Sequence, residues 1–155
     1  MRLLHTALAI SIAVAGAFAA DNPFIGTWKL IPEKSKFAPD PPPPKSLTMT
    51  FQPDGEKVRL IVTGVDSAGK PIKDDNSILW DGKFYTTNGG PMGPGRVAVK
   101  RVNNNQNEVM IEAGGKKVLT IKSVLSKDGK TMRNVADGVN TKGEKIHSDE
   151  VFEKQ

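Results

Sequence analysis

The sequence predicts an all-β protein, an antiparallel up-and-down β-barrel of about 8–10 strands. Polar and apolar residues alternate along most segments after Lys45, as in strands with one buried face. Turn signals recur about every 10 to 15 residues, and no sustained apolar period of about 3.6 residues follows Lys45. Because each connection resembles a local hairpin, a barrel is favoured over a Greek-key sandwich, which needs at least one long crossing connection.

The predicted strands follow one another along the chain, separated by turns rich in glycine, asparagine and aspartate. They cover residues 24–30, 47–51, 58–62, 73–80, 84–87, 97–102, 109–113, 119–125, 131–139 and 145–153. A turn of helix is expected near residues 33–37. Asp81-Gly82 is predicted to be the hairpin turn that joins Trp80 to Phe84, because such turns need positive φ.

The N-terminus has the three parts of a secretory signal peptide. Arg2 precedes an apolar run over residues 3–18, and Ala17-Phe18-Ala19 has the small-x-small pattern of a cleavage site. Residues 1–19 are therefore predicted to be removed, with a membrane anchor that stays attached as the alternative. The run is shorter than the about 20 residues of a membrane span. Residues 20–155 are predicted to form one barrel domain without stable membrane insertion.

Composition narrows the setting in which this domain works. The chain of 155 residues has no cysteine, whereas small exported domains with thin cores usually depend on disulfides. We therefore expect a bacterial periplasmic or secreted protein whose stability comes from packing and a closed hydrogen-bond ladder. The net charge of +5 is spread over predicted turns rather than forming a basic stripe among aromatics, so nucleic-acid binding is not expected.

Two segments stand outside the strand pattern. Residues 38–45 contain four consecutive prolines and are predicted to be an extended, stiff connector; a ligand for a proline-recognising domain is the alternative. Residues 88–95 are rich in glycine and proline and are predicted to be a rim loop, or else a mobile cap over a barrel mouth.

The first predicted strand carries a family resemblance. Phe24, Gly26 and Trp28 resemble the Gly-x-Trp of the lipocalins, in the calycin superfamily, and the Phe-x-Gly-x-Trp that opens the ten-strand barrel of fatty-acid-binding proteins. The whole chain also resembles a group of exported bacterial lipocalin-like proteins. The resemblance implies a barrel that holds a small apolar or amphipathic molecule. The Arg-x-Tyr pair that holds a carboxylate in fatty-acid-binding proteins is missing from residues 148–154, so that mechanism is not supported.

The candidate cavity residues are large apolar side chains, and a few charged ones, whose alternation points inward. They are Trp28, Phe51, Leu60, Trp80, Ile121, Arg133, Glu150 and Phe152. Arg133 and Asp137 alternate in phase with valines, and Glu150 lies between Ile146 and Phe152. Because buried charges need partners, an Arg133–Glu150 pair is expected to orient a polar ligand group. The alternatives are an outward face, a register slip of one residue, or a purely structural pair.

Catalytic and metal chemistry are not expected. His147 is the one histidine outside residues 1–19, which rules out the usual Cys/His zinc sites, and its alternation turns it to solvent. Asp74-Asp75-Asn76 lacks an EF-hand loop and is predicted to be a solvated strand end. No cofactor is predicted.

Three functions remain open. The first is an exported protein that binds a small hydrophobic or amphipathic ligand. The second is a structural or protein-interaction module of the bacterial envelope, with a filled barrel and a protein partner that the sequence does not name. The third, least favoured, is an enzyme. Since small-molecule sites usually enclose about 300 Å³ or more, the interior of the barrel separates the first two.

Overall fold

The computed structural model describes residues 22–37, 42–87, 94–140 and 142–155. The predicted signal peptide lies outside these residues, as do residues 38–41 of the proline-rich connector and residues 88–93 of the predicted rim loop or cap. No helix in the described segments is both long and apolar enough to cross a membrane.

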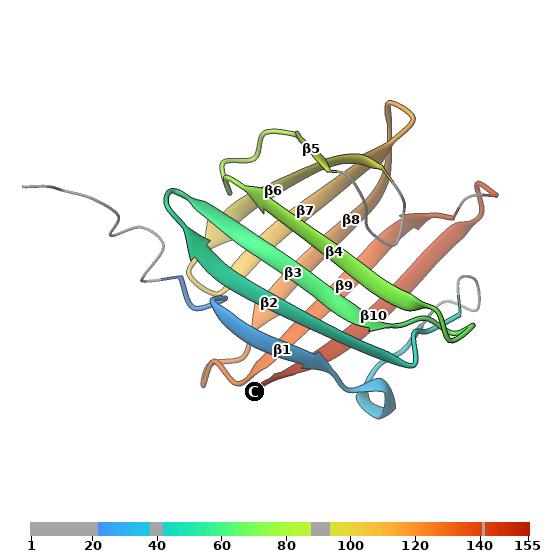
Figure 1. The fold of residues 1–155 in the computed structure, drawn as a ribbon, viewed down its shortest axis with the longest axis horizontal. Coiled ribbons are helices and arrows are strands. Elements are labelled where there is room, and N and C mark those ends of the chain that lie inside the picture. Colours follow the sequence, from blue (N-terminus) through green and yellow to red (C-terminus); the bar gives the residue numbers. More distant parts are fainter. Residues whose placement is uncertain (1–21, 38–41, 88–93, 141) are drawn as a thin grey trace, which may run out of the picture.

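Within the described residues, ten antiparallel strands form one sheet that curls into a nearly closed barrel (Figure 1). The strands are β1 (Gly26–Leu30), β2 (Ser46–Asp54), β3 (Lys57–Val65), β4 (Pro71–Ile78), β5 (Tyr85–Thr87), β6 (Gly95–Asn103), β7 (Gln106–Ala113), β8 (Lys116–Leu125), β9 (Thr131–Val139) and β10 (Lys145–Lys154). Each strand pairs with its neighbours in sequence, except that β4 does not pair with β5 and β1 pairs with β10. The predicted up-and-down barrel is therefore confirmed.

The barrel remains open between β4 and β5, where a hairpin was expected. Gly82 does adopt a positive φ of 81°, but its N–H donates to Val99 O at 2.9 Å, and Asp81 forms an isolated bridge with Lys100. The segment therefore crosses from β4 to the edge of β6, and β5 pairs with β6. The predicted Asp81-Gly82 hairpin and the fully closed ladder are both wrong, because a positive φ sets a local bend and not the partner of the next strand.

One end of the barrel is closed by packed aromatic side chains. Trp28, Phe24 and Phe152 are each 0% exposed. Trp80 packs edge-to-face against Phe24 and Phe51, with ring centroids 5.8 and 5.7 Å apart. The Trp28 Nε1–H donates to Phe24 O at 2.8 Å, so this buried indole satisfies its polar atom. We call this end the aromatic floor.

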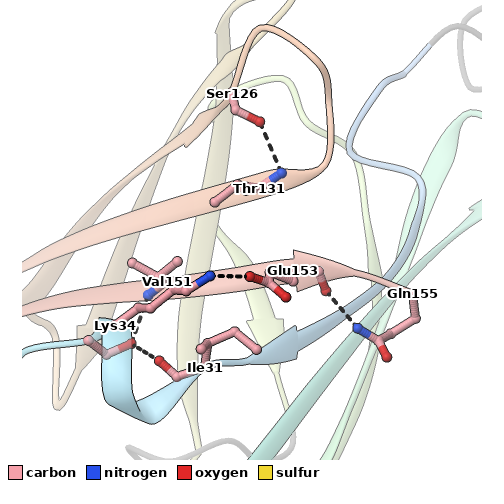
Figure 2. Close-up of polar contacts among 8 residues, drawn as sticks. Ile31, Lys34, Ser126, Thr131, Val151, Glu153 and Gln155 are labelled. Carbon is pink, nitrogen blue, oxygen red and sulfur yellow. Dashed lines mark hydrogen bonds and ion pairs between the residues drawn. The ribbon is translucent and has the colours of Figure 1, made fainter.

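The chain after β1 is tied to β10 by hydrogen bonds and an ion pair. Its only helix among the described residues is a short 3₁₀ turn, Pro32–Lys34, close to the expected turn of helix. Figure 2 shows the contacts: Lys34 pairs with Glu153 at 2.5 Å, and the Val151 N–H donates to Ser35 Oγ, which itself donates to Ile31 O. These contacts hold the segment against strand β10.

Candidate ligand site in the barrel interior

The apolar inner face is accessible above the aromatic floor. Cross-strand partners share a face of the sheet. Starting from the buried floor residues, the pairing register therefore identifies which side chains of each strand face the interior. Several inward residues of the middle and far parts are only half-buried, although Val99 and Ala136 beside them are buried. The half-buried residues include Leu60, Val97, Ile111, Leu119, Ile121 and Ile146. Side chains packed to the density of a protein core would all be buried, so this part of the interior is less completely packed than the floor.

A row of polar side chains crosses the inner face just above the floor. Asn107, Ser123, Asn134 and Glu150 are successive cross-strand partners on β7, β8, β9 and β10. On the last three strands the polar residue lies two positions from a floor residue: Leu125, Met132 or Phe152 respectively. We call these four residues the polar row. The row therefore lies between the buried floor and the half-buried part of the inner face.

The amides of the polar row have unused hydrogen-bonding capacity. Asn107 is 3% exposed and Asn134 is 7% exposed. The Oδ1 atom of each is buried without a hydrogen-bond partner among the described residues. An unpartnered buried acceptor costs about 1–3 kcal/mol. These two atoms therefore favour a bound group that donates hydrogen bonds.

The carboxyl group of Glu150 has few hydrogen-bond donors and no cation to balance its charge among the described residues. Ser148 Oγ donates to Glu150 Oε1 at 3.2 Å, and Glu150 forms no ion pair among the residues that the structure describes. Burial raises the pKa of Glu150, while the Ser148 hydrogen bond opposes that shift. The prediction that Glu150 faces inward between Ile146 and Phe152 is confirmed by the register of β10 against β9.

Arg133 lies on the outside of the barrel, so the expected Arg133–Glu150 pair is wrong. The Arg133 guanidinium donates from Nε to Asp149 Oδ1 at 2.7 Å and from Nη2 to Asp149 Oδ2. These bonds and the guanidinium charge lower the pKa of Asp149. In the register, Asn134 and not Arg133 lies opposite Glu150. The predicted orientation of β9 was wrong by one residue. The valines and Arg133 share one face, which was predicted to be the inner one, whereas Met132 on the opposite face packs into the floor.

Asp137 is likewise on the outer face, where its Oδ1 lies 2.7 Å from His147 Nδ1. The His147 side chain is 63% exposed, which confirms the expectation that it faces solvent. Neither residue is placed to act inside the barrel.

The remaining predicted cavity residues divide between two regions. Trp28 and Phe152 belong to the buried floor, and Phe51 and Trp80 pack against it. Leu60 and Ile121 face the accessible interior. Whether any of them contacts a ligand stays a prediction. The sequence analysis missed the polar row apart from Glu150, although Ser123 alternates in phase with Leu119 and Ile121 and so carried the signal.

The acidic cluster on β4 is divided between the two faces of the sheet. Asp75 forms a bidentate pair with Arg59 outside, at 2.7 and 2.6 Å. Asp74 and Asn76 pair in the register with Val62 and Leu60, which face inward, and the Asn76 amide donates to Asp74. The expectation of a wholly solvated strand end is wrong. Within the described segments no three His, Asp or Glu side chains gather as metal ligands.

The far ends of β8, β9 and β10 enclose an open depression of about 430 Å³. Its lining includes the inward residues Leu119, Gly138 and Ile146 and the outward residues Asp137 and His147. None of the residues described as lining it was among the predicted cavity residues. Since these strand ends lie opposite the aromatic floor, the depression belongs to the mouth of the barrel.

Comparison with known proteins supports the architecture. No protein-family model matches the chain, and no curated protein matches its sequence significantly. Among solved structures, a Schistosoma mansoni fatty acid binding protein in complex with arachidonic acid is similar, with a TM-score of 0.59 and 14% identity over 86% of this chain and 96% of that one. A zebrafish ileal bile acid-binding protein complexed with cholic acid has a TM-score of 0.56 and 10% identity, over 86% and 99% of the two chains. At these identities the similarity shows the fold, which is the nearly closed ten-strand barrel of the fatty-acid-binding type.

Proposed function

We propose that this protein is an exported carrier that binds one small apolar or amphipathic molecule inside its barrel. The observation that carries the proposal is the contrast along the barrel axis. The floor is packed around Trp28 and Phe152, whereas inward apolar residues such as Leu60 and Ile121 are half-buried above it. A filled barrel, expected of a purely structural module, would bury these side chains as fully as the floor.

The comparisons support the same proposal. Both similar structures are complexes with small molecules that combine apolar and acidic parts, arachidonic acid and cholic acid. The present chain lacks the Arg-x-Tyr pair on its last strand, so a ligand would be held by other groups. Export rests on residues 1–19 of the sequence, and the proposed location is the periplasm or the exterior of a bacterial cell.

Catalysis is not part of the proposal. His147, the histidine best suited to act as a base, is on the outer surface paired with Asp137. The inner face carries amides, hydroxyls and carboxyls, which suit recognition of a ligand head group.

Binding can be tested with residues 20–155 after extraction of bound lipid. A neutral fluorescent probe such as N-phenyl-1-naphthylamine should bind and should be displaced by medium-chain amphiphiles. Ile121→Trp would fill the interior and is expected to weaken probe binding at least about tenfold. Val124→Trp is the matched control, because Val124 lies on the outer face of the same strand and is 43% exposed.

Two outcomes would contradict the proposal. One is no saturable probe binding, and the other is equal weakening by both tryptophan variants. Native mass spectrometry of protein purified from its own envelope would then show whether it carries a small molecule or a protein partner. N-terminal sequencing of the same material tests export, since the proposal expects a mature start near Ala20.

A further inference from the structure

The inner surface of the barrel differs in charge from the outer one. The chain as a whole has a net charge of +5. Facing inward, however, are two carboxyl groups: Glu150 in the polar row, and Asp74 on the inner face of β4. A molecule inside the barrel would therefore face carboxyl groups even though the chain as a whole is basic.

The positively charged side chains closest to the interior contact groups other than Glu150. Arg101 pairs with Asn107 at the end of the polar row, but its guanidinium turns to the β6–β7 connection. There it donates to Asn103 O at 3.4 Å and to Asn104 Oδ1 at 3.3 Å. At the floor, the Lys154 ammonium lies 5.1 Å from the Trp28 ring centroid and donates to Pro23 O at 3.3 Å. Neither cation is paired with Glu150.

The polar row therefore presents acceptors with few donors: Asn107 Oδ1 and Asn134 Oδ1 have no partner among the described residues, and Glu150 accepts from Ser148 Oγ. Glu150 and Asn134 are direct cross-strand partners, and adjacent strands lie about 4.8 Å apart. A single group with several N–H donors can reach both side chains at once. A buried carboxylate and a buried amide oxygen without partners are each unfavourable, so such a group would be held by interactions that the empty barrel lacks.

Resting on the proposed function, we propose that the barrel selects an amphiphile with a protonated amine as its head group. The ammonium donates hydrogen bonds to the Glu150 carboxylate and to Asn134 Oδ1, and the apolar tail extends toward the mouth past Ile121 and Leu119. Asn107, two strands from Asn134 and about 10 Å away along the sheet, accepts from a second donor on a larger head group.

The charge of Glu150 explains the discrimination between head groups. A carboxylate ligand would bring a second negative charge beside Glu150, where the low dielectric makes repulsion strong. An alcohol donates a hydrogen bond but offers no charge. Burial raises the pKa of Glu150, and a nearby ammonium opposes that effect by stabilising the ionised carboxylate.

A series of ligands with the same chain and different heads tests the inference. Dodecylamine, dodecanol and dodecanoate, each kept below its micelle concentration, would compete for the neutral probe at pH 7. We expect dodecylamine to bind at least about tenfold more tightly than the other two. Glu150→Gln should remove this preference, measured as the ratio of the amine and alcohol affinities of the same variant, while the far-UV circular dichroism spectrum remains. Asp149→Asn, on the outer face of the same strand, should keep it.

The outcomes separate the two proposals. If the probe and all three amphiphiles fail to bind, the proposed function itself is wrong. If they bind but dodecanoate or dodecanol equals the amine, the barrel is a carrier and the inference about its head group is overturned. Retention of the amine preference in Glu150→Gln would also overturn it.

Discussion

Replacing Trp28 with phenylalanine tests whether the Gly-x-Trp motif builds the floor of the barrel or contacts its ligand. The indole is 0% exposed, and its Nε1–H donates to the buried Phe24 O at 2.8 Å. Phenylalanine keeps an aromatic ring in the floor but removes the donor. The variant therefore isolates one buried hydrogen bond and a modest loss of volume.

The expected cost follows from these two changes. Leaving the Phe24 carbonyl without its donor costs about 1–3 kcal/mol. The smaller ring leaves a cavity of a few tens of Å³, which at about 24 cal/mol per Å³ adds about 1 kcal/mol. We expect the free energy of unfolding to fall by about 2–4 kcal/mol, and the melting temperature to fall by about 5–15 °C for a domain of this size.

Urea unfolding followed by far-UV circular dichroism measures this change without depending on tryptophan fluorescence, since the chain has only two tryptophans. Val124→Ala is the control, because Val124 is 43% exposed and surface substitutions usually stay within about 0.5 kcal/mol. A loss below about 1 kcal/mol at an unchanged m-value would refute the assignment of Trp28 to the floor. So would a selective loss of probe affinity in a variant that unfolds like the wild type.

Three further predictions concern the inner face, the outer face and the backbone. The pKa of Glu150 is raised above the ordinary 4.5, so the folded protein holds that proton to higher pH than the unfolded chain. Stability conferred by protonated Glu150 is therefore lost as pH rises through its folded pKa. In urea titrations without ligand, the free energy of unfolding of Glu150→Gln should fall less steeply with rising pH above 4.5 than that of the wild type. An equal slope in the two proteins would contradict this. Arg133→Gln should change probe affinity by less than about twofold, because its partner Asp149 is outside the barrel; a larger change in fluorescence titration would place Arg133 in the site after all. Gly138→Ala would put a methyl group 2.1 Å from Val118 O, so thermal unfolding should occur at a clearly lower temperature, and an unchanged transition would show that the mouth strands adjust freely.

The strand pattern and the inward position of the large aromatic rings could be predicted from local chemistry. Alternation with a period of two residues identifies the strands wherever one face is strongly apolar, as with Ile146 and Phe152 around Glu150. The inward position of Glu150 was therefore predicted correctly. The same signal placed Trp28 and Phe152 inside, since large rings gain most from burial.

The alternation of polar and apolar residues could not decide which face of β9 points into the barrel, because its two faces are similar in polarity. One face carries Met132, Asn134 and Ala136, and the other carries Val135 and Val139. The register against β8 and β10 places Met132 beside Leu125 and Phe152 in the floor. That pairing turns Arg133 outward, because a slip of one residue moves every side chain of a strand to the other face.

The sequence by itself determined an all-β chain, most of its turns and the apolar faces of most of its strands, because these depend on residues close together along the chain. The tertiary structure decided which strands meet, where the barrel stays open between β4 and β5, and which side chains form the polar row. Asn107, Ser123, Asn134 and Glu150 become neighbours through three successive ladders of hydrogen bonds. Their alignment depends on the register of each ladder, which no single strand specifies.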